Sequence, residues 1–186
     1  MLSPGDTATS FDGSQVLFRL ALASGRRAHC RLKQAHDQGQ DPERLARAFD
    51  ACIEAVVLAQ ASAESWIFWA HSQAGTQPAQ GWRSAWNGIS NVAAKRGRPA
   101  VSLRKATLAI LDDLAVLRNY LVHGDAPSRA RFLAQFEGKT IHEVLTVDRV
   151  EDMLRRMGGL WSEAGAITGL GTPFISSAWV SPDEFV

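Results

Sequence analysis

An all-α fold, a bundle of four to five helices, is what this 186-residue sequence predicts. Three observations favour it. Apolar residues recur three and four positions apart over long stretches, which is the spacing of one helix face. Helix start and stop signals bracket those stretches. Alternation of apolar and polar residues is nowhere strong enough to indicate a sheet. We expect one helical domain over residues 14–168, a flexible leader over 1–13 and an extended tail over 169–186.

The first helix is expected from about Ser14 to His36. We interpret its basic second half as a solvated face, and a phosphate-contacting face is the alternative. The second helix begins at Asp41-Pro42, because aspartate is a good N-cap and proline suits the first helical position. Its apolar residues are spaced by fours and threes, which predicts packing against neighbours in a bundle. They are Leu45, Phe49, Cys52, Val56, Ala59, Ala63, Trp66 and Ala70.

A basic turn separates the next two helices. The third is expected over about 82–94, after a glycine-rich loop over 75–81. The turn over 95–99 leads to a fourth helix over about 100–123, which Gly124 ends. Two adjacent apolar stripes predict that this fourth helix is buried on much of its circumference. The main stripe is Leu103, Ile110, Leu114, Leu117 and Leu121, and the second is Leu111, Ala115, Arg118 and Val122.

The last third of the chain predicts one short and one long helix. A short helix is expected over about 128–136, and the segment 141–145 is ambiguous. Thr146 is the expected N-cap of a last helix that reaches about Ala164. We expect the second and fourth helices to be the most buried. The residues that should bury them are Phe49, Cys52, Val56, Leu114, Leu117 and Leu121.

Composition argues against several classes of protein. The formal net charge of +1 gives no overall attraction to nucleic acid or membranes, so an anionic partner must meet a local patch. Polar residues interrupt the most apolar stretch, 55–70, and a membrane span needs about 20 mostly apolar residues, so we expect a core helix there. Cys30 and Cys52 form no CxxC or Cys/His cluster, which favours free thiols over a disulfide or a metal site. The N-terminus lacks the pattern of a secretory signal, and we expect a cytoplasmic protein without a cofactor.

Four residues are secondary candidates for substrate binding. Glu64 is the only formal charge between residues 55 and 82, and a lone carboxylate in such a stretch is either paired or functional. We favour structural pairing over catalysis for it. Lys95, Arg96 and Arg98 form the basic turn, which is the best local candidate for contact with a phosphate backbone.

The strongest functional candidate is the run Arg-Asn-Tyr-Leu-Val-His over residues 118–123. Arg118 interrupts an apolar stripe, and a guanidinium on such a stripe must be paired or must serve a function. Arginine offers a permanent planar cation to phosphate, and histidine gives and takes protons near neutrality. Together they suffice to cleave RNA without a metal, because the 2′-hydroxyl can be the nucleophile. His123 would act as general acid or base, and Arg118 would stabilise charge on the phosphorane.

Helix geometry complicates this pairing. Residues five apart on an ideal helix differ by roughly 140° in direction, whereas Asn119 and His123, four apart, share a face. Arg118 and His123 can still reach one cleft if the helix frays before Gly124, or if a two-fold interface combines one group from each subunit. The same spacing also occurs over residues 31–36, but there the polar residue after the arginine is missing.

The run 118–124, Arg-Asn-Tyr-Leu-Val-His-Gly near the end of a late helix, resembles the signature of HEPN domains (higher eukaryotes and prokaryotes nucleotide-binding). These are α-helical bundles, usually dimeric, and many are metal-independent endoribonucleases in toxin–antitoxin, phage-defence or RNA-processing systems. The resemblance implies that Arg118 and His123 are catalytic and that Asn119 supports them. It also implies RNA and a second copy of the chain as partners and, in a toxin–antitoxin system, an antitoxin protein.

The resemblance leaves three interpretations open. Asp125 stands where toxins paired with nucleotidyltransferase antitoxins often carry a tyrosine, so we do not expect that form of regulation. The chain is a ribonuclease, a non-catalytic HEPN-like interaction or ligand-binding module, or an unrelated helical bundle. An exposed Arg118–His123 site lined by further basic residues favours the ribonuclease. A sealed pair between Arg118 and Glu64 favours the non-catalytic module.

Overall fold

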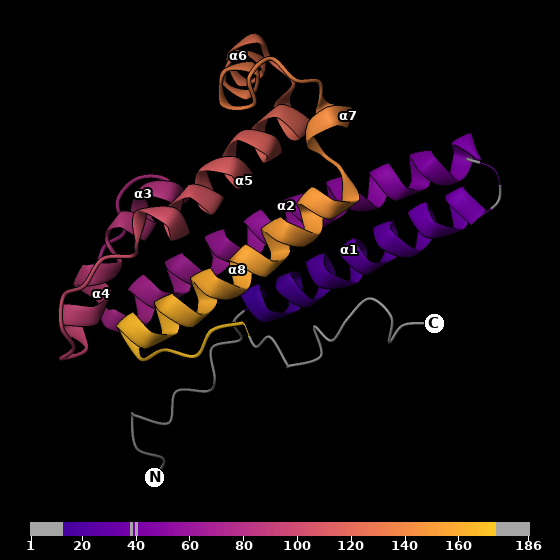
Figure 1. Cartoon of the computed structure of the whole chain (residues 1–186). Coiled ribbons are helices and arrows are strands. Elements are labelled where there is room, and N and C mark those ends of the chain that lie inside the picture. Colours follow the sequence, from indigo (N-terminus) through magenta and orange to yellow (C-terminus); the bar gives the residue numbers. More distant parts are fainter. Residues whose placement is uncertain (1–12, 38, 40, 174–186) are drawn as a thin grey trace.

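The computed structural model describes residues 13–37, 39 and 41–173, and these contain eight helices and no strand (Figure 1). The expected all-α fold is confirmed, but the helices outnumber the four to five expected. Apart from Gly13, the expected leader lies outside the described residues, as does the expected tail beyond residue 173. The long helices are α1 (Gly13–Asp37), α2 (Pro42–Ala74), α5 (Lys105–His123) and α8 (Val147–Thr168). The shorter ones are α3 (Trp82–Asn87), α4 (Ile89–Lys95), α6 (Ala126–Gln135) and α7 (Ile141–Val144).

The four long helices make the body of the bundle. Helices α1 and α2 pack along each other, α8 lies against both, and α5 packs on α2 and α8. The short helices sit at the two ends of α5 (Figure 1). Helices α3 and α4 lie near its beginning, whereas α6 and α7 lie near its C-terminal end. The last turn of α5 is therefore placed at an end of the bundle, beside α6.

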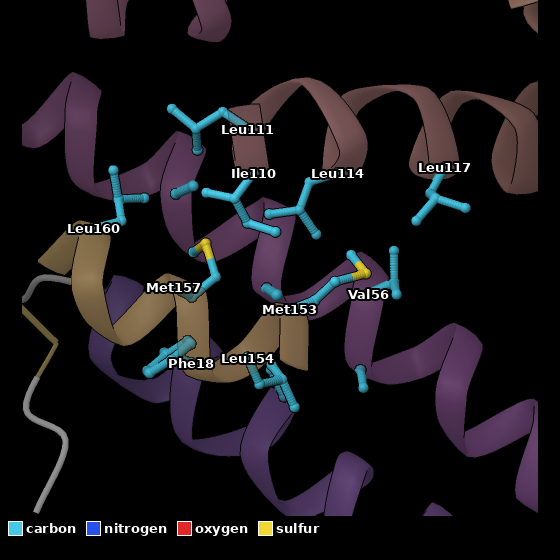
Figure 2. Packing of buried hydrophobic residues seen from close by; sticks show 14 of the residues in the cluster. Phe18, Val56, Ile110, Leu111, Leu114, Leu117, Met153, Leu154, Met157 and Leu160 are labelled. Carbon is cyan, nitrogen blue, oxygen red and sulfur yellow. The ribbon is translucent and has the colours of Figure 1, made fainter. Parts of the chain in front are cut away.

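The core lies where α5 meets α8 and α2 (Figure 2). Four of the six residues expected to bury the second and fourth helices are indeed buried, and the remaining two, Phe49 and Leu121, are only half-buried. These two lie at the end of the bundle, where they line a pocket instead. The fully buried residues at this junction include Ile110, Leu111, Leu114 and Leu117 of α5, Met157 and Leu160 of α8, and Val56 of α2.

The expected third helix is broken at Gly88 into α3 and α4. The cause is the buried imidazole of His71 from α2, whose Nε2 lies 3.1 Å from the carbonyl oxygen of Ala85. A Cβ atom at Gly88 would come within 3.2 Å of that ring, so the chain turns there at a residue without a side chain. This contact joins residues that are 17 positions apart in the sequence, counting 88 − 71.

The expected fourth helix begins at Lys105, five residues later than expected from about residue 100. Its N-terminus is capped by Glu163 of α8, which accepts hydrogen bonds from the backbone N–H of Arg104 at 2.7 Å and from Thr107 Oγ1 at 2.6 Å. The ambiguous segment 141–145 contains the single turn α7, which begins with a capping box formed by Thr140 and Glu143.

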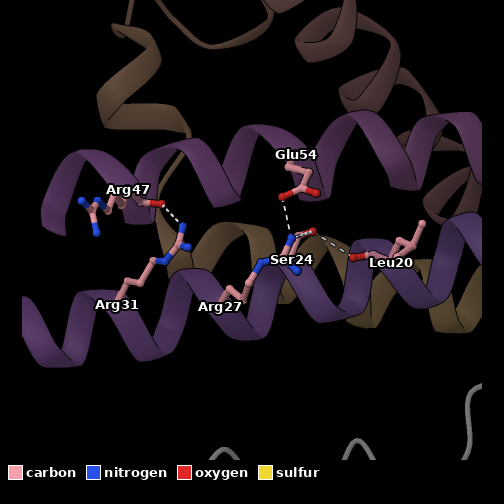
Figure 3. Close-up of polar contacts among 6 residues, drawn as sticks. All are labelled: Leu20, Ser24, Arg27, Arg31, Arg47 and Glu54. Carbon is pink, nitrogen blue, oxygen red and sulfur yellow. Dashed lines mark hydrogen bonds and ion pairs between the residues drawn. The ribbon is translucent and has the colours of Figure 1, made fainter. Parts of the chain in front are cut away.

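The basic half of α1 is anchored to α2 (Figure 3). Arg27 donates to Glu54 at 2.6 Å, and Arg31 donates to the carbonyl oxygen of Arg47 at 3.0 Å. Both contacts are exposed, in agreement with the interpretation of this half as a solvated face. These cations therefore have a structural partner.

Among the described helices, α2 alone is long and apolar enough to cross a membrane. However, 56% of its most apolar window is buried inside the bundle, as expected for the predicted core helix.

Candidate functional site

The predicted motif lies in the last turn of α5, immediately before the corner into α6. Gly124 ends α5 in the left-handed conformation, with φ of 60°, and its N–H donates to the carbonyl oxygen of Tyr120 at 3.1 Å. The next residue, Asp125, is the N-cap of α6, and its side chain accepts from the N–H of Ser128 at 2.8 Å. The predicted helix stop is confirmed, and it places His123 on the final residue of α5.

The three motif residues contact one another within one subunit. Nη1 of Arg118 donates to Oδ1 of Asn119 at 3.1 Å, and it lies 2.8 Å from Nε2 of His123. Because arginine keeps its protons in proteins and has no acceptor, Nε2 must be the acceptor in this pair. The imidazole is then neutral and carries its proton on Nδ1. The long arginine side chain thus spans the angular offset, without fraying of the helix.

The arginine retains unused donors. Both of its hydrogen bonds use Nη1, and within the described residues Nη2 and Nε of Arg118 have no partner. No carboxylate lies within ion-pair distance of Arg118 in that part of the chain. Arg118 and Asn119 are half-buried, and His123 is exposed. The free edge of the guanidinium can therefore hold an anion in a bidentate manner, next to a histidine that can exchange a proton.

Helix α6 adds positive charge beside the motif. Arg129 and Arg131 are both exposed, and neither has an ion-pair partner among the described residues. Hydrogen bonds from Ser128, aided by the positive charge of Arg131, lower the pKa of Asp125. No motif in the sequence predicts a functional role for these two arginines. The signal that could have found them is their position just after the helix stop, in a short helix that must fold back near the motif.

Glu64 does not reach the motif. It accepts a hydrogen bond from Nε2 of Gln60 at 2.8 Å, one turn earlier on α2. This agrees with structural pairing of Glu64, although the partner is a neighbouring amide and not Arg118. A sealed Arg118–Glu64 pair is absent from the described structure.

The basic turn lies at the other end of α5 from the motif (Figure 1). Helix α5 has 19 residues, and a helix of that length spans about 28 Å. Arg96 Nε donates to the carbonyl oxygen of Thr168 at 3.1 Å, and Arg98 Nη1 donates to that of Ala166 at 3.1 Å. Both guanidiniums therefore satisfy carbonyl groups at the C-terminal end of α8, where positive charge is favourable. Lys95 is exposed on the same turn. The structure does not bring these three residues to the motif.

Comparisons with protein-family models, with curated proteins and with solved structures found no match to this chain. The HEPN resemblance rests on the seven residues of the motif and stays a prediction.

Proposed function

We propose that this chain is a metal-independent endoribonuclease whose catalytic residues are Arg118 and His123. The observation that carries the proposal is the contact of 2.8 Å between Nη1 of Arg118 and Nε2 of His123, at an accessible helix end. The structural arginines Arg31, Arg96 and Arg98 donate to backbone carbonyls of other helices, whereas Arg118 has neither such a contact nor an acid partner within the described residues. The exposed arginines of α6 supply further attraction for a polyanion.

The proposed reaction is an internal transesterification. The scissile phosphate binds the free Nη2 and Nε edge of the guanidinium through two oxygens, and the imidazole leaves Nη1 for the substrate. The 2′-hydroxyl oxygen attacks phosphorus, the bond from phosphorus to the 5′-oxygen breaks, and a 2′,3′-cyclic phosphate and a 5′-hydroxyl result. His123, freed from Arg118, takes the proton from the 2′-hydroxyl or gives one to the leaving 5′-oxygen. Arg118 stabilises the negative charge that builds up on the phosphorane. Asn119 is a positioning residue, since its Oδ1 holds Nη1.

A homodimer would complete this reaction, because one histidine cannot be base and acid in the same step. In the proposed assembly the motifs of two subunits face one cleft, so that a second His123 supplies the other proton transfer. The exposed side of α5 near the motif offers an apolar contact, since Val122 is 52% exposed. The proposal places the enzyme in the cytoplasm, with RNA as substrate and an antitoxin protein as partner if it belongs to a toxin–antitoxin system.

The decisive experiment incubates the purified protein with total RNA in the presence of EDTA. The wild type should leave 2′,3′-cyclic phosphate, or its 3′-phosphate hydrolysis product, and 5′-hydroxyl ends. His123→Ala should lose about 10²–10⁴-fold in rate, the usual contribution of general acid–base assistance. Arg118→Lys should also fail, because a point charge cannot replace a bidentate fork.

His36→Ala is the matched control for the histidine variant. His36 is also exposed and lies near the end of a helix, five residues after Arg31, but it is outside the motif. Its loss should leave cleavage unchanged. Inhibition by EDTA, a 5′-phosphate on the products, or equal activity of the wild type and His123→Ala would each refute the mechanism.

A further inference from the structure

A pocket of about 340 Å³ opens beside the last turn of α5, and the cleavage chemistry described above does not use it. Its volume falls in the range of small-molecule sites, about 300–1,000 Å³. Its walls come from α2, α5 and the segments that follow α5, so sequence-distant residues meet there. It is lined by Phe49, Tyr120, Leu121, Gly124, Arg129 and Ile141.

The two aromatic walls of this pocket are held in place from behind. Tyr120 stacks on Phe132 of α6, with ring centroids 4.3 Å apart and planes inclined by 24°. Phe132 is itself buried, so the tyrosine ring rests on the core. Phe49 packs against the ring of His142, with centroids 4.4 Å apart. Rings fixed in this way lose little conformational freedom when a flat ligand contacts them.

The positive charge of the pocket fits a ligand that carries a phosphate or another anionic group. Arg129 is the one charged residue among those that line it, and no carboxylate does so. Two aromatic rings, two aliphatic side chains and one guanidinium suit a planar aromatic ring joined to a phosphate. Bases stack on aromatic side chains whatever their sequence, and an arginine can add a cation–π or phosphate contact.

The pocket and the motif share one helix end. Tyr120 and His123 are three residues apart and therefore neighbours on the helix surface. Leu121 of the pocket is likewise three residues after Arg118, so the pocket lies beside the motif on the surface of α5. Gly124, which has no side chain, lines the pocket directly after His123.

We propose that this pocket binds a nucleobase of the RNA, next to the phosphate held by Arg118. The inference rests on the proposed ribonuclease function and names its substrate subsite. Phe49 and Tyr120 stack on the base, and Arg129 contacts the adjoining phosphate. The pocket is therefore the part of the enzyme that selects the base at the cleavage site.

Binding of nucleoside 3′-monophosphates, measured by calorimetry against inorganic phosphate, tests the pocket without any need for cleavage. At least one of the four common 3′-nucleotides should bind the wild type about 5- to 150-fold more tightly than phosphate, the range that base–aromatic stacking gives. Phe49→Leu should remove this advantage, whereas Phe49→Tyr, which keeps a ring, should retain it. Phe68→Leu is the matched control, because Phe68 is on the same helix, is 37% exposed and does not line the pocket. It should bind like the wild type.

Cleavage of single-base oligonucleotides separates this inference from the proposed function. We expect Phe49→Leu to cleave all four bases at similar rates, and the wild type to prefer one. If the wild type cleaves RNA but Phe49→Leu keeps both the base preference and nucleotide binding, the pocket assignment is wrong and the ribonuclease stands. If nucleotides bind in a Phe49-dependent manner but RNA is not cleaved, the site is a nucleotide site and the ribonuclease proposal fails. If the wild type binds no nucleotide and Phe49→Leu alters the sedimentation coefficient, the pocket is an interface between copies and the assignment is wrong.

Discussion

Replacing Arg118 by alanine distinguishes a guanidinium that serves a ligand from one that serves the fold. In wild type, its hydrogen bonds go to Asn119 and His123, and its side chain has no carboxylate partner within the described residues. After truncation, Nε2 of exposed His123 can bond to water instead. We therefore expect a loss of about 1 kcal/mol or less in the free energy of unfolding, the range of exposed polar contacts. For a chain of this size, that corresponds to a melting temperature lower by at most about 4 °C.

The comparison variant is Leu117→Ala, one residue earlier on the same helix. Leu117 is fully buried, so its truncation should cost about 2–5 kcal/mol, or roughly 4–20 °C in melting temperature. Thermal denaturation followed by far-UV circular dichroism measures both variants beside the wild type. A buried structural ion pair broken by Arg118→Ala would cost about 3–5 kcal/mol. Our reasoning would be refuted if Arg118→Ala lowered the melting temperature as much as Leu117→Ala does and the wild type were inactive. Those two results together would favour a non-catalytic module.

Two further predictions concern groups outside the motif. Burial raises the pKa of Glu163, but the hydrogen bonds from Thr107 and Arg104 outweigh burial and lower this pKa overall. The ionised carboxylate therefore stabilises the fold at pH values above its pKa in the unfolded chain. This stabilisation is lost as the pH falls through the pKa of Glu163 in the folded protein. Glu163→Gln should therefore cost about 1–3 kcal/mol in urea unfolding near neutral pH, and the difference from wild type should shrink in acid; a constant difference would contradict the cap. Burial, with a smaller effect of Glu151, raises the pKa of the Cys52 thiol to about 12, whereas Cys30 is exposed. A thiol reagent at mildly alkaline pH should label one cysteine in the native protein and both in denaturant; rapid labelling of two native thiols would show that α2 opens readily.

The sequence predicted best what is determined by neighbouring residues. The side chain of Asp41 accepts from the N–H of Glu43 at the start of α2, and that of Thr146 accepts from the N–H of Arg149 at the start of α8. Each cap depends on residues within one turn, so the local pattern sufficed. Six of the eight residues predicted for the apolar stripe of α2 are buried, because the helical period alone brings them to one face, whereas Leu45 and Phe49 near its N-terminal end are half-buried.

The differences arose from contacts between distant residues. The break at Gly88 depends on His71, and the late start of α5 depends on Glu163, which follows it by 58 residues, counting 163 − 105. The pocket beside the motif likewise needs α6 to fold back so that Phe132 supports Tyr120. No local sequence pattern predicts these contacts, because each depends on the tertiary arrangement of the helices. The motif could be found in advance, but its surroundings could not.

The second copy of the arginine–histidine spacing, Arg31 and His36 on α1, provides an internal comparison. It too lies near a helix end, since α1 ends at Asp37. Yet the guanidinium of Arg31 donates to the backbone carbonyl of Arg47 on α2, and no hydrogen bond joins it to His36 in the described structure (Figure 3). The spacing and the helix end are shared with the motif on α5, but the arginine is used differently.

Two features account for this difference. The residue after Arg31 is the aliphatic Leu32, whereas the residue after Arg118 is Asn119, whose Oδ1 holds Nη1. Helix α1 also lies along α2, which offers a competing carbonyl acceptor, whereas the motif on α5 has no such acceptor in the described part of the neighbouring helices. In the proposed site, a local acceptor therefore orients Arg118, which makes no hydrogen bond to a neighbouring helix within the described residues. This arrangement leaves the remaining guanidinium donors of Arg118 for an anion that the protein itself does not supply.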